Sequence, residues 1–118
     1  MLLDVVIGDA AGAHQAALNR WMLLEGRPRP PPPQHSVEAA MDAAGFHLHV
    51  AEDAGPRQCA AATEGWNRLT SVLRREGQPG SRTSSLALVT EAEVWLLRLR
   101  LMNAGAIGLR RWHATLRG

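Results

Sequence analysis

The sequence contains a single cysteine, Cys59, and this scarcity excludes two kinds of structure. One thiol cannot form an internal disulfide, and a zinc site built from several cysteines is ruled out. The neighbouring alanines at 60–62 indicate a helix face. On such a face the usual interpretation is a buried and unreactive thiol.

Lysine is absent, and all 13 basic residues are arginines set against 11 carboxylates, for a net charge of +2. The arginines are dispersed, and only Arg74–Arg75 and Arg110–Arg111 are adjacent. Nucleic-acid binding typically shows a basic stripe with interleaved aromatic residues. The sequence has no such stripe, so we expect no nucleic-acid partner.

Long apolar runs are also missing, and no stretch approaches the roughly 18 residues that a membrane-spanning helix requires. The first residues, Met1 to Asp4, carry neither a basic segment nor a small-residue cleavage site. We therefore expect no membrane association, no signal peptide and a cytoplasmic location.

Three segments have the pattern of β-strands. Residues 2–7 (LLDVVI) form a nearly continuous apolar run, typical of a strand buried on both faces in an α/β sheet. In the second, residues 46–52, Phe46, Leu48 and Val50 alternate with His47 and His49, which predicts two distinct faces. The third covers residues 106–116. The His-x-His pair lacks a third ligand at a telling spacing, so we expect exposed histidines and no metal site.

Four segments have the pattern of helices. The first, residues 13–25, is closed by Gly26. Each of the other three carries its own boundary signal or apolar stripe. They are residues 37–44 with Ser36 as N-cap, residues 57–76 with Cys59, Ala62, Trp66, Leu69 and Leu73 buried, and residues 90–104 with a Thr90–Glu93 capping box and Trp95, Leu96, Leu99 and Met102 as apolar positions.

Two stretches read as connections between these elements. Residues 27–34 (RPRPPPPQ) predict an extended, proline-rich surface connector. Residues 77–85 (GQPGSRTSS) predict a loop that joins an inserted pair of helices at about 57–104. We interpret residues 1–118 as belonging to one domain.

The turn after the first strand, Gly8 to Gly12, resembles the opening of a dinucleotide-binding fold. That fold requires G-x-G-x-x-G, so that the backbone can approach a pyrophosphate at a helix N-terminus. Here Ala10 and Ala13 occupy the positions of the second and third glycines, and Gly12 is out of register. A small dinucleotide-binding protein is therefore a minor alternative.

Order and spacing in the second half resemble the class I S-adenosylmethionine-dependent methyltransferases. The run Met41-Asp42-Ala43-Ala44-Gly45-Phe46 leads into an alternating strand that ends in Glu52-Asp53. In that family a helix ending in "AGF" precedes the sixth strand, which often closes on "ED", and an inserted helical pair often follows. Residues 109–114 (LRRWHA) resemble the seventh strand, and residues 2–7 match the fifth.

This resemblance implies an α/β fold, namely a partial Rossmann-like methyltransferase sheet made of strands five to seven with flanking helices. The seventh strand would lie antiparallel between the fifth and the sixth. The implied cofactor is S-adenosylmethionine, but the glycine-rich loop and ribose-binding acid of the first four strands are not encoded here. The resemblance therefore implies a C-terminal, substrate-side fragment that is inactive alone, either a truncated product or one half of a split enzyme.

Ligands of open α/β sheets bind beyond the carboxyl ends of the strands. This rule makes Asp9, His14 and Trp21 the candidate substrate-binding residues, and no general base can be named. The partner would be the N-terminal half, or a second copy that pairs through the first strand, whose apolar edge has no Lys, Pro or bulge to block it. A non-catalytic interaction module that uses this edge is the main alternative function.

Overall fold

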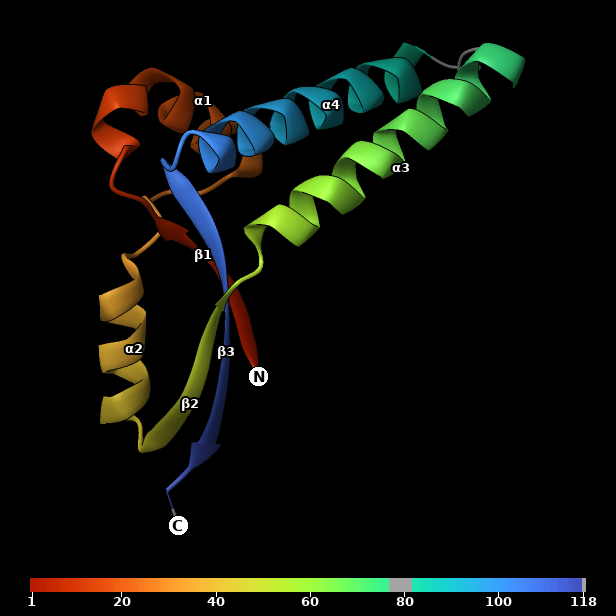
Figure 1. Cartoon of the computed structure of the whole chain (residues 1–118). Helices are drawn as coiled ribbons and strands as arrows, with labels where there is room; N and C mark the ends of the chain where they lie inside the picture. The colour runs from red at the N-terminus through yellow and green to blue at the C-terminus, as the bar shows by residue number, and fades with distance from the viewer. Residues whose placement is uncertain (77–81, 118) are drawn as a thin grey trace.

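The computed structural model describes residues 1–76 and 82–117, which form a mixed α/β structure. Within these residues the chain forms three strands, four α-helices and one short 3-10 helix (Figure 1). In chain order they are β1 (Leu2–Ile7), η1 (Ala11–His14), α1 (Gln15–Glu25), α2 (Gln34–Ala43), β2 (Phe46–Asp53), α3 (Gly55–Glu76), α4 (Arg82–Asn103) and β3 (Ile107–Leu116).

The three strands form one sheet in the order β1-β3-β2. The last strand, β3, pairs antiparallel with both neighbours, so the two outer strands run parallel to each other. Its register with β1 runs from Leu2 opposite Trp112 to Ile7 opposite Ile107. The predicted position of the C-terminal strand between the other two is confirmed.

One face of the sheet packs against α1 and α4 at its upper end (Figure 1). Directly opposite residues share a face, so the register places Val5 with Leu109 on this side. The helices supply large apolar side chains to the same core, and Trp21 of α1 is 0% exposed. The other buried members contributed by the helices are Leu18, Val94, Leu97 and Leu101.

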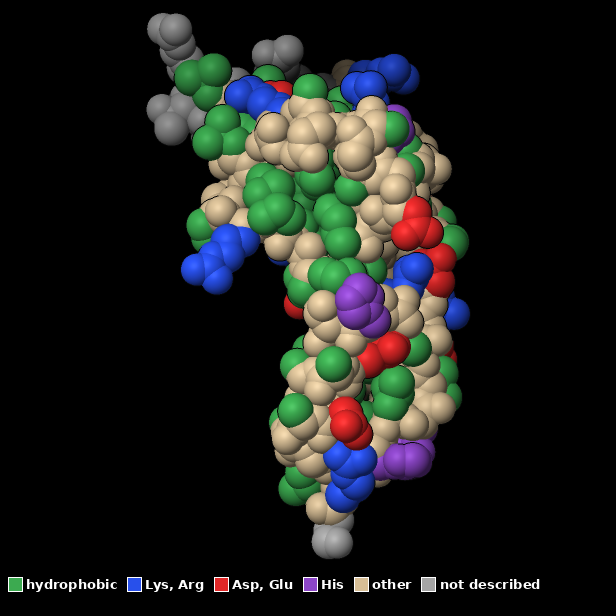
Figure 2. All heavy atoms as spheres, turned by 90° about the vertical axis from the view of Figure 1, so that its left-hand side faces the viewer, with side chains coloured by type: hydrophobic (Ala, Val, Ile, Leu, Met, Phe, Trp, Pro, Cys, Tyr) green, Lys and Arg blue, Asp and Glu red, His purple; other side chains and the backbone are tan. Residues whose placement is uncertain are grey.

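The opposite face is covered by α2. Trp112 is fully buried on this side, and its Nε1 donates a hydrogen bond of 3.1 Å to Glu38 of α2. At the other end of the helix, Arg117 forms an ion pair of 2.9 Å with Asp42. Seen from the α2 side, acidic, basic and histidine side chains are interspersed over the described surface (Figure 2).

The predicted helical pair is present as α3 and α4, which extend away from the sheet as an arm (Figure 1). The described chain is accordingly elongated, at 55 × 29 × 23 Å. Trp66 and Trp95 are both half-buried in the arm, as their helical stripes predict. No helix of the described residues is long and apolar enough to cross a membrane.

The start of α4 differs from the prediction. The helix begins at Arg82, so the expected loop at 77–85 is helical from residue 82, and its residues 77–81 lie outside the described part of the chain. The expected capping box at Thr90 and Glu93 is wrong, because the Thr90 hydroxyl donates within the helix to the Leu86 carbonyl. Leu96, expected to be buried, is 63% exposed. Because α4 is apolar around most of its circumference, periodicity cannot select the face that packs.

The start of α2 also differs. The helix begins at Gln34, with Pro33 in the N-cap position, and Ser36 lies inside its first turn. The Ser36 and Val37 amides both donate to the Pro33 carbonyl, so the proline-rich connector ends by starting the helix. The expected Ser36 cap is therefore wrong.

A β-bulge at His49 breaks the predicted alternation of β2. Leu48 pairs with Ala114, whereas Val50 pairs with the adjacent residue His113. Adjacent residues of β3 point to opposite faces, so Leu48 and Val50 do not share a face as expected. The inserted residue shifts the second half of the strand by one position.

The outer edge of β1 is partly protected. The Ile7 amide donates to the Pro32 carbonyl at 3.0 Å, and the Val5 amide donates to the Asp4 carboxylate at 2.8 Å. The expectation that no proline blocks this edge is therefore wrong at its carboxyl end. The predicted burial on both faces holds only for Val5 and Val6, since Leu2 and Leu3 at the start of the strand stay 42% and 46% exposed.

Candidate functional site

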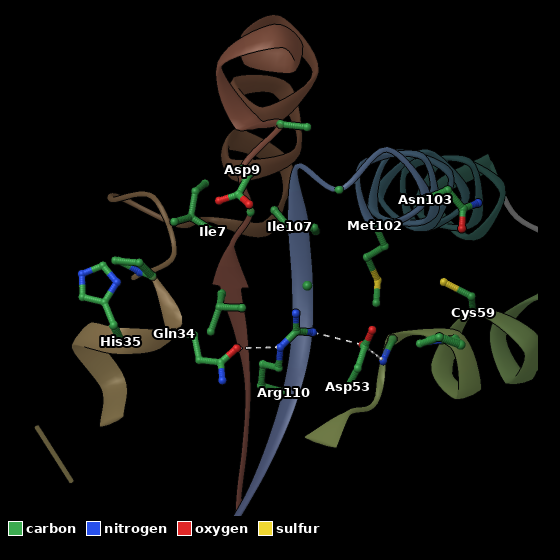
Figure 3. A pocket seen from close by; sticks show the side chains of 18 of the residues that line it. Ile7, Asp9, Gln34, His35, Asp53, Cys59, Met102, Asn103, Ile107 and Arg110 are labelled. Carbon is green, nitrogen blue, oxygen red and sulfur yellow. Dashed lines mark hydrogen bonds and ion pairs between the residues drawn. The ribbon is translucent and has the colours of Figure 1, made fainter. Parts of the chain in front are cut away.

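A cleft of about 800 Å³ lies at the carboxyl ends of β1 and β2 (Figure 3). Its walls come from the loop after β1, the start of α2, the start of α3 and the end of α4. The polar and ionisable lining residues are Asp9, Gln34, His35, Glu38, Asp53, Cys59, Asn103 and Arg110.

Arg110 forms the centre of this cleft (Figure 3). Its Nε donates 2.9 Å to the Gln34 side-chain oxygen, and its Nη1 lies 3.1 Å from Asp53 Oδ1. The β2–β3 register pairs Arg110 with Asp53, which brings both side chains to the α2 face. The guanidinium therefore joins α2 to the end of β2 and holds two walls of the cleft together.

Asp53 also fixes the start of α3. Its Oδ1 accepts a hydrogen bond of 2.9 Å from the Gly55 amide, one of the unpaired donors at the helix N-terminus. The Ala54 amide donates to the Leu109 carbonyl at 2.9 Å. These two contacts attach the base of the arm to the sheet beside the cleft.

The other two carboxylates differ in their partners. Glu38 Oε1 accepts from the Gln34 side-chain amide at 2.9 Å and from Trp112 at 3.1 Å. Asp9 is exposed on the loop after β1 and has no hydrogen-bond or ion-pair partner among the described residues. Its carboxylate is drawn above Arg110, next to Ile7 and Ile107 (Figure 3).

Cys59 lines the cleft from the first turns of α3. Burial raises the pKa of its thiol, the negative charge of Asp53 raises it further, and Arg98 acts in the opposite direction. The thiol is half-buried in the cleft wall rather than buried as predicted. Its raised pKa disfavours the thiolate, which is the reactive form.

Close packing explains why the residue after β1, Gly8, is a glycine. A Cβ at this position would lie 2.1 Å from the backbone oxygen of Gly105, in the turn before β3. The Gly8 amide donates to the Ala106 carbonyl at 2.8 Å, which holds the two backbones in contact. This glycine therefore permits the close approach of the protein's own backbone, and its position needs no pyrophosphate to explain it.

The three predicted substrate-binding residues lie in different surroundings. Asp9 lines the cleft, whereas His14 is exposed at the end of η1 and is not among the lining residues. Trp21 is fully buried in the core, and its Nε1 donates 2.9 Å to Glu25. Of the three, only Asp9 reaches the cleft.

Sequence reasoning missed Arg110, Gln34 and Glu38 as members of this site. Arg110 and Asp53 lie in segments that carry the methyltransferase resemblance, but nothing in the sequence pairs them. Gln34 could not be found because the prediction assigned it to the connector at 27–34, whereas the helix begins at this residue. Glu38 lies inside the predicted helix, but no sequence signal indicates that it faces a cleft.

The two strand histidines lie away from the cleft. Their ring centroids are 4.9 Å apart, both side chains are exposed, and His49 Nε2 lies 2.8 Å from the Thr115 hydroxyl. The described residues contain no group of three or more His, Cys, Asp or Glu side chains that could hold a metal ion.

Comparisons of this chain with protein-family models, with curated proteins and with solved structures found no match.

Proposed function

We propose that this chain is the C-terminal, substrate-side part of a class I S-adenosylmethionine-dependent methyltransferase domain. The observation that carries the proposal is the order β1-β3-β2, with the last strand antiparallel between two parallel strands. The family resemblance implies this arrangement for its fifth, seventh and sixth strands. A helical pair between β2 and β3 is a second feature that the family often has.

In this proposal the cleft around Arg110 holds the methyl acceptor. Ligands of open α/β sheets bind beyond the carboxyl ends of the strands, which is where the cleft lies. Arg110 and Asp53 keep its walls at a fixed spacing, and Asp9 offers a carboxylate to the bound molecule. The cofactor would be supplied by the family's first four strands, which are not part of this chain.

The partner in this proposal is the N-terminal half of the domain, which joins the outer edge of β1. Leu2 and Leu3 are both more than 40% exposed there, unlike the buried Val5 and Val6. Added strands and their helices would remove these apolar side chains from water. Without that half, the chain would transfer no methyl groups.

Calorimetric titration with S-adenosylmethionine tests this proposal. We expect no binding at micromolar cofactor by this chain alone, because it encodes neither a glycine-rich loop nor an acidic partner for the ribose. Mixed with a polypeptide encoded in frame upstream of Met1, the chain should form a complex that binds one cofactor. The matched control is the same polypeptide with the first loop glycine replaced by valine.

Two results would overturn the proposal. Tight stoichiometric binding of the cofactor by the isolated chain would mean that it contains a complete site. An upstream frame without a glycine-rich loop would remove the proposed partner.

A second candidate function, a non-catalytic interaction module, is favoured by the same exposed edge of β1. Its amino-terminal residues Leu2 and Leu3 are apolar and exposed, and in the described structure β1 pairs with β3 on one side only. Such an edge is a template for pairing with a strand of another protein. The two candidates differ in the native mass and in cofactor binding by the complex, since a module would associate without creating a cofactor site.

A further inference from the structure

The ionisable side chains that line the Arg110 cleft are unbalanced in charge. Three carboxylates, Asp9, Glu38 and Asp53, face one guanidinium, that of Arg110. Arg110 is already neutralised by Asp53 at 3.1 Å and bound to Gln34 at 2.9 Å. Little of its charge therefore remains for an incoming anion.

Each carboxylate keeps at least one oxygen without a protein donor among the described residues. Asp53 uses Oδ1 for both Arg110 and the Gly55 amide, which leaves Oδ2. Glu38 uses Oε1 for both of its donors, which leaves Oε2. Asp9 has both oxygens available. The cleft therefore offers hydrogen-bond acceptors that carry negative charge.

The remaining lining indicates which kind of cation fits. Apolar side chains of Ile7, Pro33, Pro56 and Met102 can contact an alkyl chain. Among the described residues no Phe, Tyr or Trp lines the cleft, so they form no aromatic cage of the kind that recognises quaternary ammonium groups. A cation with N–H donors, by contrast, can form charge-assisted hydrogen bonds to the carboxylates.

We propose that this cleft binds a small organic cation with N–H donors, an amine or a guanidine, with Asp9 as the residue that contacts its charged group. Binding of such a cation depends only on the cleft. Its identification as the methyl acceptor rests on the proposed function.

Titration followed by backbone amide NMR tests the proposal with the chain as it is. The three probes are butylamine, tetramethylammonium and butyrate, which have similar size but differ in charge and in N–H donors. We expect butylamine to shift the amides of Gly8, Asp9, Gly55 and Gly105 with a Kd of about 1 mM, corresponding to about 4 kcal/mol. Tetramethylammonium should bind about fivefold more weakly, and butyrate should cause no saturable shifts at these positions.

The variant Asp9→Asn should weaken butylamine binding by about fivefold, because it removes the free carboxylate from an exposed loop without removing a protein contact. The matched control is Asp42→Asn, which makes the same change in net charge at the far end of α2, where Asp42 pairs with Arg117. We expect this control to bind butylamine as the unmodified chain does.

Butyrate binding as tight as that of butylamine would overturn the proposal, and so would an Asp9→Asn variant with unchanged affinity. If tetramethylammonium binds as tightly as butylamine, recognition through N–H donors is wrong. The cofactor titration is independent of these results, so amine binding without cofactor binding by the assembled complex would contradict only the methyltransferase proposal.

Discussion

Replacing Gly8 by alanine should destabilise the protein strongly, because the backbone of another segment occupies the space that a methyl group would need. The added Cβ would lie 2.1 Å from the Gly105 oxygen and 2.9 Å from its carbonyl carbon. Ordinary van der Waals contact begins near 3.4 Å, so the two segments would have to separate by more than 1 Å. Neither atom belongs to a flexible side chain that could move aside.

That separation would stretch two hydrogen bonds, from Gly8 to Ala106 at 2.8 Å and from Ala10 to Gly105 at 3.1 Å. Each contributes about 1 kcal/mol, and the overpacking itself costs about 1–3 kcal/mol. We therefore expect the free energy of unfolding to fall by about 3 kcal/mol. For a chain of this length the loss corresponds to a melting temperature about 10 °C lower.

Thermal and urea unfolding followed by circular dichroism measures this effect, and Gly12→Ala is the matched control. A Cβ at Gly12 meets nothing within 4 Å, so this variant should stay within about 0.5 kcal/mol of the unmodified chain. Equal stabilities of the two variants would refute the packing of Gly8 on Gly105. A Gly8→Ala variant that is fully stable but loses binding of a nicotinamide or flavin nucleotide would instead support the dinucleotide-binding alternative.

Three further predictions concern exposed charges, the cysteine and the sheet edge. The Arg20 guanidinium donates two hydrogen bonds to Glu93, at 2.9 and 3.0 Å, and lowers the pKa of that carboxyl; Arg20→Gln should return the Glu93 pKa, measured by NMR titration, toward its usual range. Because the folded-state pKa is the lower one, the stability difference between the two proteins should be present near neutral pH and vanish as the pH falls through the lowered value. Burial, and to a smaller extent the charge of Asp53, raises the pKa of the Cys59 thiol. Asp53→Asn should therefore speed alkylation of this single thiol at mildly alkaline pH. An unchanged rate would exclude the Asp53 carboxylate as a cause of the raised pKa. The exposed end of β1 should cause self-association at about 100 μM in light scattering after size exclusion; a monomer at that concentration, matched by a Leu3→Lys variant, would show that Pro32 and Asp4 protect the edge sufficiently.

The sequence alone determined where the strands lie. The strand patterns of residues 2–7 and 46–52 are set by the order of apolar and polar residues along the chain. The bounds of the observed strands agree with the predicted bounds within a residue. The glycines at 26, 45 and 105 close their helices with positive φ, as their positions after helical patterns predict. The order of the three strands came from the family resemblance, since periodicity within a strand says nothing of its partners.

Only the tertiary structure decided the faces of the elements and the composition of the cleft. Leu96 and Leu97 are both apolar, and only the position of α1 and the sheet makes Leu97 the buried one. The bulge at His49 becomes visible only against the register of β3. Arg110, Gln34 and Asp53 are distant in sequence. They meet because β2 pairs with β3 in the sheet and α2 covers the face on which Arg110 and Asp53 lie. Local patterns cannot specify such contacts, because they depend on how whole elements pack together.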